Sequence, residues 1–323
     1  MSVPYIESSS YKAPPLFSNG HLQTLYPYFF RKIHDVKFER SRFNTICGDF
    51  LDVDLSLIGS DELVIVSHGL EGSSDSQYIK GMTKHFNMNG KDVLAWNMRS
   101  CSGELNKQPG FYHAGMTDDL DLMVQYGLKH SYKKIFLVGF SLGANLTALY
   151  LGQRASQLAP AISSAAIFSA PCDLGKSAEK ISRRRYRFYL ESFLITMRQK
   201  IKDKSQMMDL GVSLEGIDKI KSFQEFDDRF TGPLHGFKDG SHYYKEVSCK
   251  PWLEKINIPT LIVNAKDDPF LTKECFPIEE ARRNKNIFLE IPKTGGHVGF
   301  VSFNSDRLYW SEERAHDFFK NIG

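Results

Sequence analysis

Short apolar runs of strand length alternate with segments of helical pattern along most of this 323-residue chain. The runs are continuous rather than alternately apolar and polar, which is typical of strands buried on both faces. They lie at Glu62–Ser67, Asp92–Met98, Ile135–Val138, Ala165–Ser169, Pro259–Asn264 and Asn286–Ile291. Helical patterns lie at Gln77–Met88, from Thr117 onward, at Leu146–Leu151 and at about Ser305–Lys320. This alternation predicts an α/β fold with a mostly parallel central sheet and helices on both faces.

The helix from Thr117 has a recognisable start. A threonine hydroxyl can accept a hydrogen bond from a free N–H of the first helical turn, so Thr117 is predicted to be the N-cap. Asp118, Asp119 and Asp121 follow it. Carboxylates at these positions stabilise the positive end of the helix dipole.

The alternation stops between Cys172 and about Lys255, where the sequence is helical in pattern and rich in charge. Aromatic and apolar residues are interleaved there with basic ones: Lys176, Lys180, Arg183, Arg184, Arg185, Arg187, Arg198, Lys200, Lys202 and Lys204. Such a run fits either a solvated helix face or a surface that contacts lipid. We therefore predict an α/β core at residues 1–171 and 256–323, interrupted by a helical insertion at residues 172–255.

The pattern Gly-Phe-Ser-Leu-Gly at residues 139–143 joins an apolar strand directly to a helix. A Gly-x-Ser-x-Gly pattern in this setting is typical of a nucleophile elbow, a sharp turn that exposes a serine hydroxyl at the edge of a sheet. The two glycines lack a β-carbon, so strand and helix can approach closely. Ser141 is therefore the candidate nucleophile. The N–H of Leu142, at the start of the helix, is a candidate donor to an oxyanion.

A serine hydroxyl needs an imidazole to take its proton, and the imidazole needs a carboxylate to fix its tautomer. After an elbow of this kind the acid precedes the histidine in the chain. His297 follows the last predicted strand in a glycine-rich loop and is the candidate base. Asp268 and Asp267 follow the strand at Pro259–Asn264, and Asp173 follows the preceding strand. All three are candidate acids, and Asp268 is favoured by its spacing from the end of its strand.

The second oxyanion donor is expected in the loop after Glu62–Ser67. The N–H of Leu70 is the candidate, and His68 is expected to brace this loop rather than to take part in the chemistry. Acyl transfer by these residues needs no metal or organic cofactor. The sequence contains no P-loop, no dinucleotide fingerprint and no His-Glu-x-x-His pattern.

Composition narrows the function classes further. The 41 basic and 38 acidic residues leave a net charge of +3, which gives no support for a nucleic-acid partner. Five cysteines without a C-x-x-C pair favour a reducing compartment. No apolar signal core lies in Met1–Pro15, so a cytoplasmic location is expected. The uncharged stretch Ile135–Gly152 approaches the length of a membrane span, but its glycines, Ser141 and Asn145 favour a buried strand followed by a buried helix.

Six stretches of the chain together resemble the α/β-hydrolase superfamily and, within it, the YheT-like branch. They are residues 19–24 (NGHLQT), 68–73 (HGLEGS), 97–104 (NMRSCSGE), 111–119 (FYHAGMTDD), 139–145 (GFSLGAN) and 295–300 (GGHVGF). The likeness extends over nearly the whole chain and is weakest in the insertion. This branch includes abhydrolase-domain lipid hydrolases and medium-chain fatty-acid ethyl ester synthases.

The resemblance implies a catalytic triad of Ser141, Asp268 and His297, with the insertion as a lid. It implies cleavage of short- to medium-chain acyl esters through an acyl-serine intermediate. Two alternatives stay open: transfer of the acyl group to an alcohol by the same triad, and a catalytically inactive binding protein. The expected partners are small acyl esters or lipids, with peripheral membrane contact through the basic, aromatic lid. No nucleic-acid partner and no obligate protein partner is expected.

Overall fold

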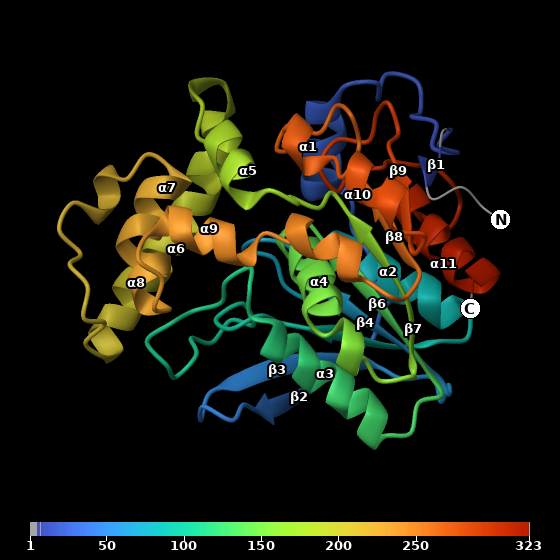
Figure 1. The fold of residues 1–323 in the computed structure, drawn as a ribbon, viewed down its shortest axis with the longest axis horizontal. Helices are drawn as coiled ribbons and strands as arrows, with labels where there is room; N and C mark the ends of the chain where they lie inside the picture. Colours follow the sequence, from blue (N-terminus) through green and yellow to red (C-terminus); the bar gives the residue numbers. More distant parts are fainter. Residues whose placement is uncertain (1–4, 7, 323) are drawn as a thin grey trace.

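A computed structural model describes residues 5–6 and 8–322, and nine strands of these residues form one sheet (Figure 1). The strand order is β1-β9-β8-β7-β6-β4-β5-β3-β2. The strands are β1 (Tyr5–Ile6), β2 (Glu39–Asn44), β3 (Phe50–Ser56), β4 (Glu62–Ser67), β5 (Asp92–Trp96), β6 (Lys134–Phe140), β7 (Ile162–Phe168), β8 (Thr260–Val263) and β9 (Ile287–Glu290). Neighbours are parallel from β1 to β5, and β3 and β2 complete the sheet as antiparallel strands.

Helices cover both faces of the sheet, as the sequence predicts. The helices around the sheet are α1 (Gly20–Phe30), α2 (Gln77–Met88), α3 (Thr117–Lys129), α4 (Leu142–Gln153), α10 (Ile278–Arg283) and α11 (Trp310–Ile322). Between β7 and β8 lie α5 (Leu174–Ile181), α6 (Arg187–Met207), α7 (Phe223–Phe226), α8 (Gly232–Leu234) and α9 (Gly240–Val247). Figure 1 shows α5 to α9 gathered on the side of the molecule opposite the two termini.

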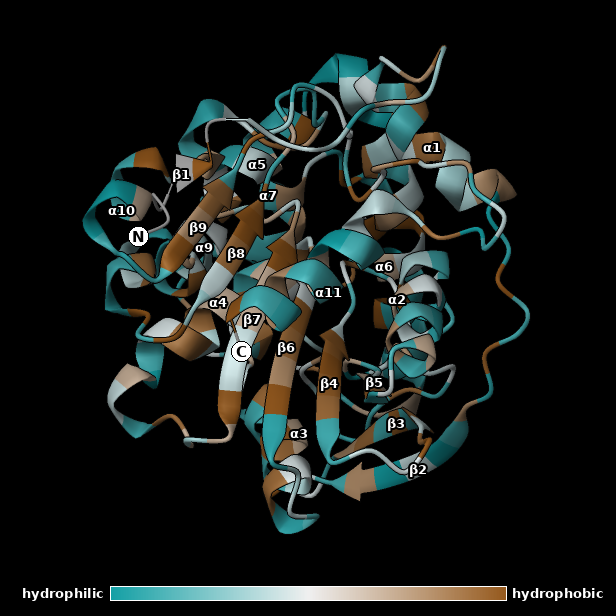
Figure 2. Cartoon of the chain, turned by 90° about the vertical axis from the view of Figure 1, so that its right-hand side faces the viewer, coloured by the Kyte–Doolittle hydropathy of each residue, from teal (hydrophilic) through white to brown (hydrophobic). Residues whose placement is uncertain are grey.

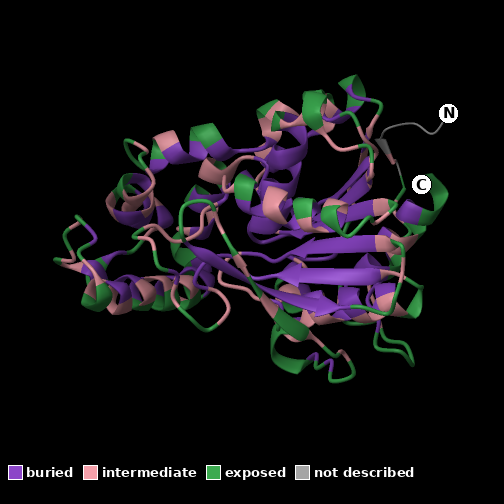
Figure 3. Ribbon diagram, turned by 90° about the horizontal axis from the view of Figure 1, so that it is seen from below, coloured by how far each residue is buried: buried purple, intermediate pink, exposed green. Residues whose placement is uncertain are grey.

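The alternation of side chains along each central strand builds two separate cores. On β4, Leu63 and Ile65 pack in the cluster that includes α3 and α4, whereas Val64 and Val66 pack in the cluster that includes α2 and α11. The central strands therefore need apolar residues at most positions, and the middle of the sheet is strongly hydrophobic in Figure 2. Most positions of these strands are buried in Figure 3, where exposed residues lie on outer helix turns and loops.

The six predicted strands are all present, with ends that differ by a few residues. The two antiparallel strands β2 and β3 were not predicted, because their sequences carry charges. Arg42 of β2 contacts the buried Asp52 of β3 at 2.7 Å, and Arg40 contacts the buried Asp54 at 2.8 Å. The cross-strand ion pairs allow acidic side chains inside a sheet, where an apolar pattern gives no signal.

The prediction for Thr117 is wrong in detail. The N-cap of α3 is Met116, and Thr117 is the first helical residue, whose hydroxyl lies 3.2 Å from Gln153 Oε1 of α4. Asp118 and Asp119 do lie in the first turn. Asp119 faces inward and forms a two-pronged ion pair with Arg99, so it has a structural partner in addition to the helix dipole.

Helices α5 to α9 lie between β7 and β8, but the basic side chains of this segment do not form one surface. Arg198 and Lys204 of α6 are buried. Arg198 contacts Glu191 at 2.8 Å and donates to the Ile220 carbonyl. The prediction that the basic residues share a solvated or lipid-facing surface is therefore wrong for Arg198 and Lys204. Among the helices of residues 8–322, none has the combination of length and apolar character that crossing a membrane requires.

Candidate active site

Ser141 occupies the turn between β6 and α4 in a strained backbone conformation, with φ of 54° and ψ of −118°. A positive φ is costly for a residue with a β-carbon and persists only where the surroundings enforce it. The surroundings are tight on both sides. A β-carbon at position 139 would lie 2.6 Å from the Gly143 carbonyl oxygen, and one at position 143 would lie 2.4 Å from the His68 carbonyl oxygen. The two glycines thus allow the turn that exposes the Ser141 hydroxyl.

The structure brings Ser141, His297 and Asp268 into one hydrogen-bonded chain. His297 Nε2 lies 2.8 Å from Ser141 Oγ, and its Nδ1 lies 2.8 Å from Asp268 Oδ2. The other carboxylate oxygen of Asp268 accepts a hydrogen bond from the Phe270 N–H at 2.8 Å. The side chain of Asp268 is inaccessible to solvent, so its charge is held in place by these contacts. This arrangement can accept the serine proton on the imidazole during attack on a carbonyl carbon.

The other two candidate acids have different partners. Asp267 Oδ1 accepts a hydrogen bond from the Gly296 N–H at 2.9 Å, which ties the histidine loop to the acid loop. Burial and the neighbouring charge of Asp268 raise the pKa of Asp267. Asp173 caps α5 by accepting from the Lys176 N–H at 3.0 Å. Of the three carboxylates, Asp268 is the one in contact with the imidazole.

Helix α1 supports the histidine loop, a role that sequence reasoning missed. Thr24 Oγ1 accepts a hydrogen bond from the His297 N–H at 2.9 Å, and Gln23 Oε1 accepts from the Val301 N–H at 2.9 Å. A β-carbon at Gly296 would lie 2.4 Å from the Gly20 carbonyl oxygen. Within the family motif at residues 19–24, Gly20 and Gln23 are buried and Thr24 is partly buried, and the contacts of these three residues with the histidine loop account for their part of the motif.

The two proposed oxyanion donors lie beside Ser141. Leu142 is the first residue of α4, where an N–H has no acceptor inside the helix. The Gly69 N–H donates to the Tyr78 hydroxyl and the Glu71 N–H to the Tyr112 hydroxyl. Between them, the Leu70 N–H makes no hydrogen bond to the described part of the chain. A β-carbon at Gly69 would approach the Ser141 β-carbon to 3.1 Å, so this loop passes directly against the serine.

His68 holds the loop that carries Leu70. Its Nδ1 lies 2.7 Å from the Gly69 carbonyl oxygen, and its Nε2 accepts from the Met98 N–H at 3.0 Å. Complete burial lowers the pKa of His68 to about 4, so the ring is neutral at pH 7. A neutral ring with one donor and one acceptor matches these two partners, and this geometry agrees with the bracing role expected from the sequence.

A cavity with about 1010 Å³ of empty space, part of it open to solvent, lies beside Ser141 and His297. Leu70 and Leu142 also line it. Much of the remaining wall is apolar and comes from the helices between β7 and β8: Leu174, Ile181, Ile201, Phe223, Phe226 and Phe230. The Phe270 ring lies 4.3 Å from that of His297 and adds an apolar surface at the reactive end. A long apolar group can therefore reach the serine without leaving contact with apolar side chains.

The chain belongs to the α/β-hydrolase superfamily, because residues 62–303 match the family described as the alpha/beta hydrolase fold, and its similarity to YheT places it in the YheT-like branch. It is 33% identical to YheT of Escherichia coli (strain K12) over 306 residues, which cover 91% of this chain and 88% of that protein. It is 27% identical to a monoacylglycerol lipase of Saccharomyces cerevisiae, with 92% of this chain and 77% of that protein covered.

Solved structures confirm the fold. An esterase of Pyrococcus furiosus superposes with a TM-score of 0.60 at 19% identity, covering 89% of this chain and 92% of that chain. Among sequence relatives, the human phospholipase ABHD3 is 29% identical to this chain, and the matched region covers 87% of this chain and 71% of that protein. The predicted fold class, an α/β-hydrolase with a mostly parallel sheet, is therefore confirmed.

Proposed function

We propose that the protein is a serine carboxylic-ester hydrolase that cleaves short- to medium-chain acyl esters. The observation that carries this proposal is the chain of two 2.8 Å contacts joining Ser141, His297 and Asp268 at the mouth of an apolar cavity. The names of several relatives, which are a monoacylglycerol lipase, a phospholipase and a putative esterase, support ester chemistry for this family.

The reaction would proceed through an acyl-enzyme. Ser141 Oγ attacks the ester carbonyl carbon as His297 Nε2 takes its proton, and the N–H groups of Leu70 and Leu142 stabilise the oxyanion. Collapse of the tetrahedral intermediate breaks the bond to the alcohol oxygen, which receives the proton from His297. Water then attacks the acyl-serine with His297 again as base, releasing the acid and restoring Ser141.

The proposal predicts turnover of p-nitrophenyl acetate, hexanoate and dodecanoate by the purified protein, with the highest kcat/KM at short or medium chain length. It also predicts stoichiometric labelling by a fluorophosphonate probe, because such probes react with an activated serine. One outcome would favour acyl transfer to alcohols: the probe labels the protein, but no ester is hydrolysed, or products form only when an alcohol is added. Absence of both labelling and turnover would indicate a binding protein.

We further propose that residues 172–255 form a lid on a core made of residues 1–171 and 256–323. The lid supplies much of the apolar cavity wall, and it touches the loop of the proposed acid. Lys180 of α5 donates to the Asp268 carbonyl oxygen at 2.9 Å, and the Tyr189 ring of α6 packs on Phe270 at 4.9 Å. Movement of these helices would therefore alter both the access of substrate to Ser141 and the position of the loop that carries Asp268.

We also propose that the turn before α6 and the first residues of α6 contact anionic lipid surfaces. Arg184, Arg185 and Arg187 are exposed, and the Phe188 side chain beside them is 63% exposed. Replacing the three arginines by glutamine is expected to weaken cosedimentation with phosphatidylglycerol vesicles by at least tenfold, since each basic residue contributes about 1 kcal/mol at such a surface.

Three exposed lysines outside this segment, Lys129, Lys285 and Lys320, provide a control with the same loss of charge when they are replaced by glutamine. Equal weakening in both triple variants would attribute the binding to net charge and remove the lid surface from the proposal. Phosphatidylcholine vesicles test the charge requirement, because the proposal expects little binding to them.

A further inference from the structure

Two histidines in the cavity have no part in the proposed reaction. His113 lies in the loop before α3, and His235 follows α8 directly. Their rings lie 4.5 Å apart, and both line the same cavity as Ser141 and His297. One thus comes from the core and the other from the proposed lid.

Three ring nitrogens of this pair have no hydrogen-bond partner within the described residues. His113 Nδ1 accepts from the Gly115 N–H at 3.1 Å, which leaves its Nε2 and both nitrogens of His235 without one. These three nitrogens keep some accessible surface, because they are not among the fully buried unpartnered atoms of the described residues. They can therefore be reached from the cavity. The hydroxyl of Tyr243, which also lines the cavity, accepts from the Ala114 N–H at 3.0 Å and keeps its own proton for donation.

These polar atoms belong to a cavity wall that is otherwise mainly apolar and that includes Phe230 and Leu234. A polar group removed from bulk water costs free energy unless a partner meets it. The described residues supply no hydrogen-bond partner to His235. A polar group of a bound molecule, or a bound water, would therefore have to be its partner.

The charge state of the pair selects the kind of group. Burial lowers the pKa of His113 well below its usual value, and burial together with the charge of Arg99 lowers the pKa of His235 to about 4. Burial raises the pKa of Tyr243, so the phenol stays protonated. At pH 7 the three side chains are therefore uncharged, and they offer both donors and acceptors. An uncharged hydroxyl, which donates one hydrogen bond and accepts others, matches this set.

The position of His235 is fixed from the core side by a glycine. A β-carbon at Gly110 would lie 2.6 Å from His235 Cε1, so only a glycine lets the ring sit against this loop. The Gly110 carbonyl oxygen accepts from Asn106 Nδ2 at 2.8 Å. The loop that faces the histidine pair is therefore held by Asn106.

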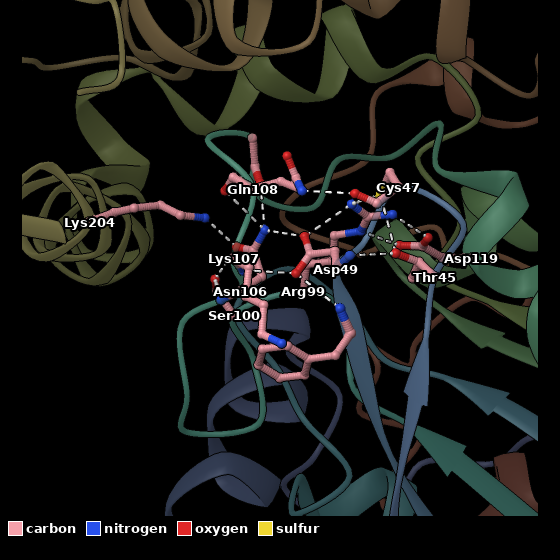
Figure 4. Close-up of polar contacts among 12 residues, drawn as sticks. Thr45, Cys47, Asp49, Arg99, Ser100, Asn106, Lys107, Gln108, Asp119 and Lys204 are labelled. Carbon is pink, nitrogen blue, oxygen red and sulfur yellow. Dashed lines mark hydrogen bonds and ion pairs between the residues drawn. The ribbon is translucent and has the colours of Figure 1, made fainter. Parts of the chain in front are cut away.

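Asn106 is in turn the centre of a buried polar network, drawn in Figure 4. Its Nδ2 also donates to Asp49 Oδ2 at 2.6 Å, and Asp49 is paired with Arg99 at 3.1 Å. Its Oδ1 accepts from Lys204, which reaches it from α6. A fully buried lysine thus anchors the proposed lid to the loop beside His235, and this ordered framework is what a selective subsite requires.

We propose that His113, His235 and Tyr243 form a subsite for an uncharged hydroxyl group of the substrate, carried either on the acyl chain or on the alcohol part of the ester. The inference rests on the proposed ester hydrolysis and names a feature of its substrate.

Two pairs of nearly isosteric esters distinguish the sources of the hydroxyl. 2-Hydroxyethyl octanoate against propyl octanoate tests the alcohol part, and methyl 8-hydroxyoctanoate against methyl nonanoate tests the acyl chain. In at least one pair, the wild-type protein is expected to show a kcat/KM about tenfold higher for the hydroxyl ester, the value of one well-placed hydrogen bond.

The variant His235→Phe keeps a ring and removes the hydrogen bonds, so it is expected to bring that ratio close to one. His235→Gln retains a donor and an acceptor and is expected to keep part of the preference. His242→Phe is the matched control, since His242 lies in the same insertion but does not line the cavity, and it should keep the wild-type ratio.

Each result decides the assignment. Equal kcat/KM within both pairs for the wild-type protein overturns it without any variant, and shows that water alone occupies the subsite. A preference that survives in both His235→Phe and His113→Phe assigns the hydroxyl to other residues. If no ester is turned over, the proposed function itself fails, and the subsite fails with it. Turnover of the plain esters without discrimination overturns the subsite alone.

Discussion

Replacement of Ser141 by alanine is expected to lower kcat for ester hydrolysis by about 10⁶-fold. The acyl-enzyme cannot form without the hydroxyl, whereas binding in the apolar cavity and the oxyanion donors are retained. The alanine keeps the β-carbon that already stands at this strained position, so stability should change little. Initial rates on p-nitrophenyl hexanoate, together with loss of fluorophosphonate labelling and an unchanged melting temperature, check the expectation.

The same experiment with His297 separates a triad from a lone reactive serine. His297→Ala should cost about as much as Ser141→Ala, and the double variant little more than either, because the residues act as one unit. His130→Ala is a suitable control, since His130 is exposed at the end of α3 and does not line the cavity. If the loss of kcat in the double variant equalled the product of the two single losses, the two residues would act independently, and the common mechanism would be contradicted.

The sequence was sufficient to predict the elbow because its chemistry is local. Gly139 and Gly143 flank the serine, and the short distances at both positions show why each must lack a β-carbon. The six strands β4 to β9 were predictable for a related reason, since a strand buried on both faces is apolar at most positions. His297 and Asp268 were reached through chain order, and the structure shows them in contact with each other.

Features that depend on distant partners could not be predicted in this way. Thr24 and Gln23 lie about 270 residues from the loop that they hold, and nothing in their local pattern indicates it. Lys204 was expected among exposed basic residues, whereas it is buried in contact with Asn106 and over the Phe111 ring. Burial of a cation depends on partners contributed by other elements, which periodicity along one helix cannot reveal.

A second large effect on kcat is expected from the choice of acid between the adjacent carboxylates Asp267 and Asp268. Asp268→Asn is expected to lower kcat by about 10⁴-fold, whereas Asp267→Asn should lower it by no more than about tenfold. Asp267 holds the Gly296 N–H through Oδ1, and an asparagine oxygen can keep that contact. Asp173→Asn serves as a further control, because an asparagine also caps a helix well.

The large loss at Asp268 follows from the direction of its hydrogen bonds. The Phe270 N–H must meet an acceptor, so the amide oxygen of an asparagine would occupy the place of Oδ1 and turn the amide NH₂ toward His297 Nδ1. The imidazole would then keep its proton on Nε2, the nitrogen that faces Ser141, and could not accept the serine proton. Fluorophosphonate labelling rates and ester turnover measure the loss directly. If Asp267→Asn rather than Asp268→Asn caused the larger loss, the acid would be reassigned to Asp267.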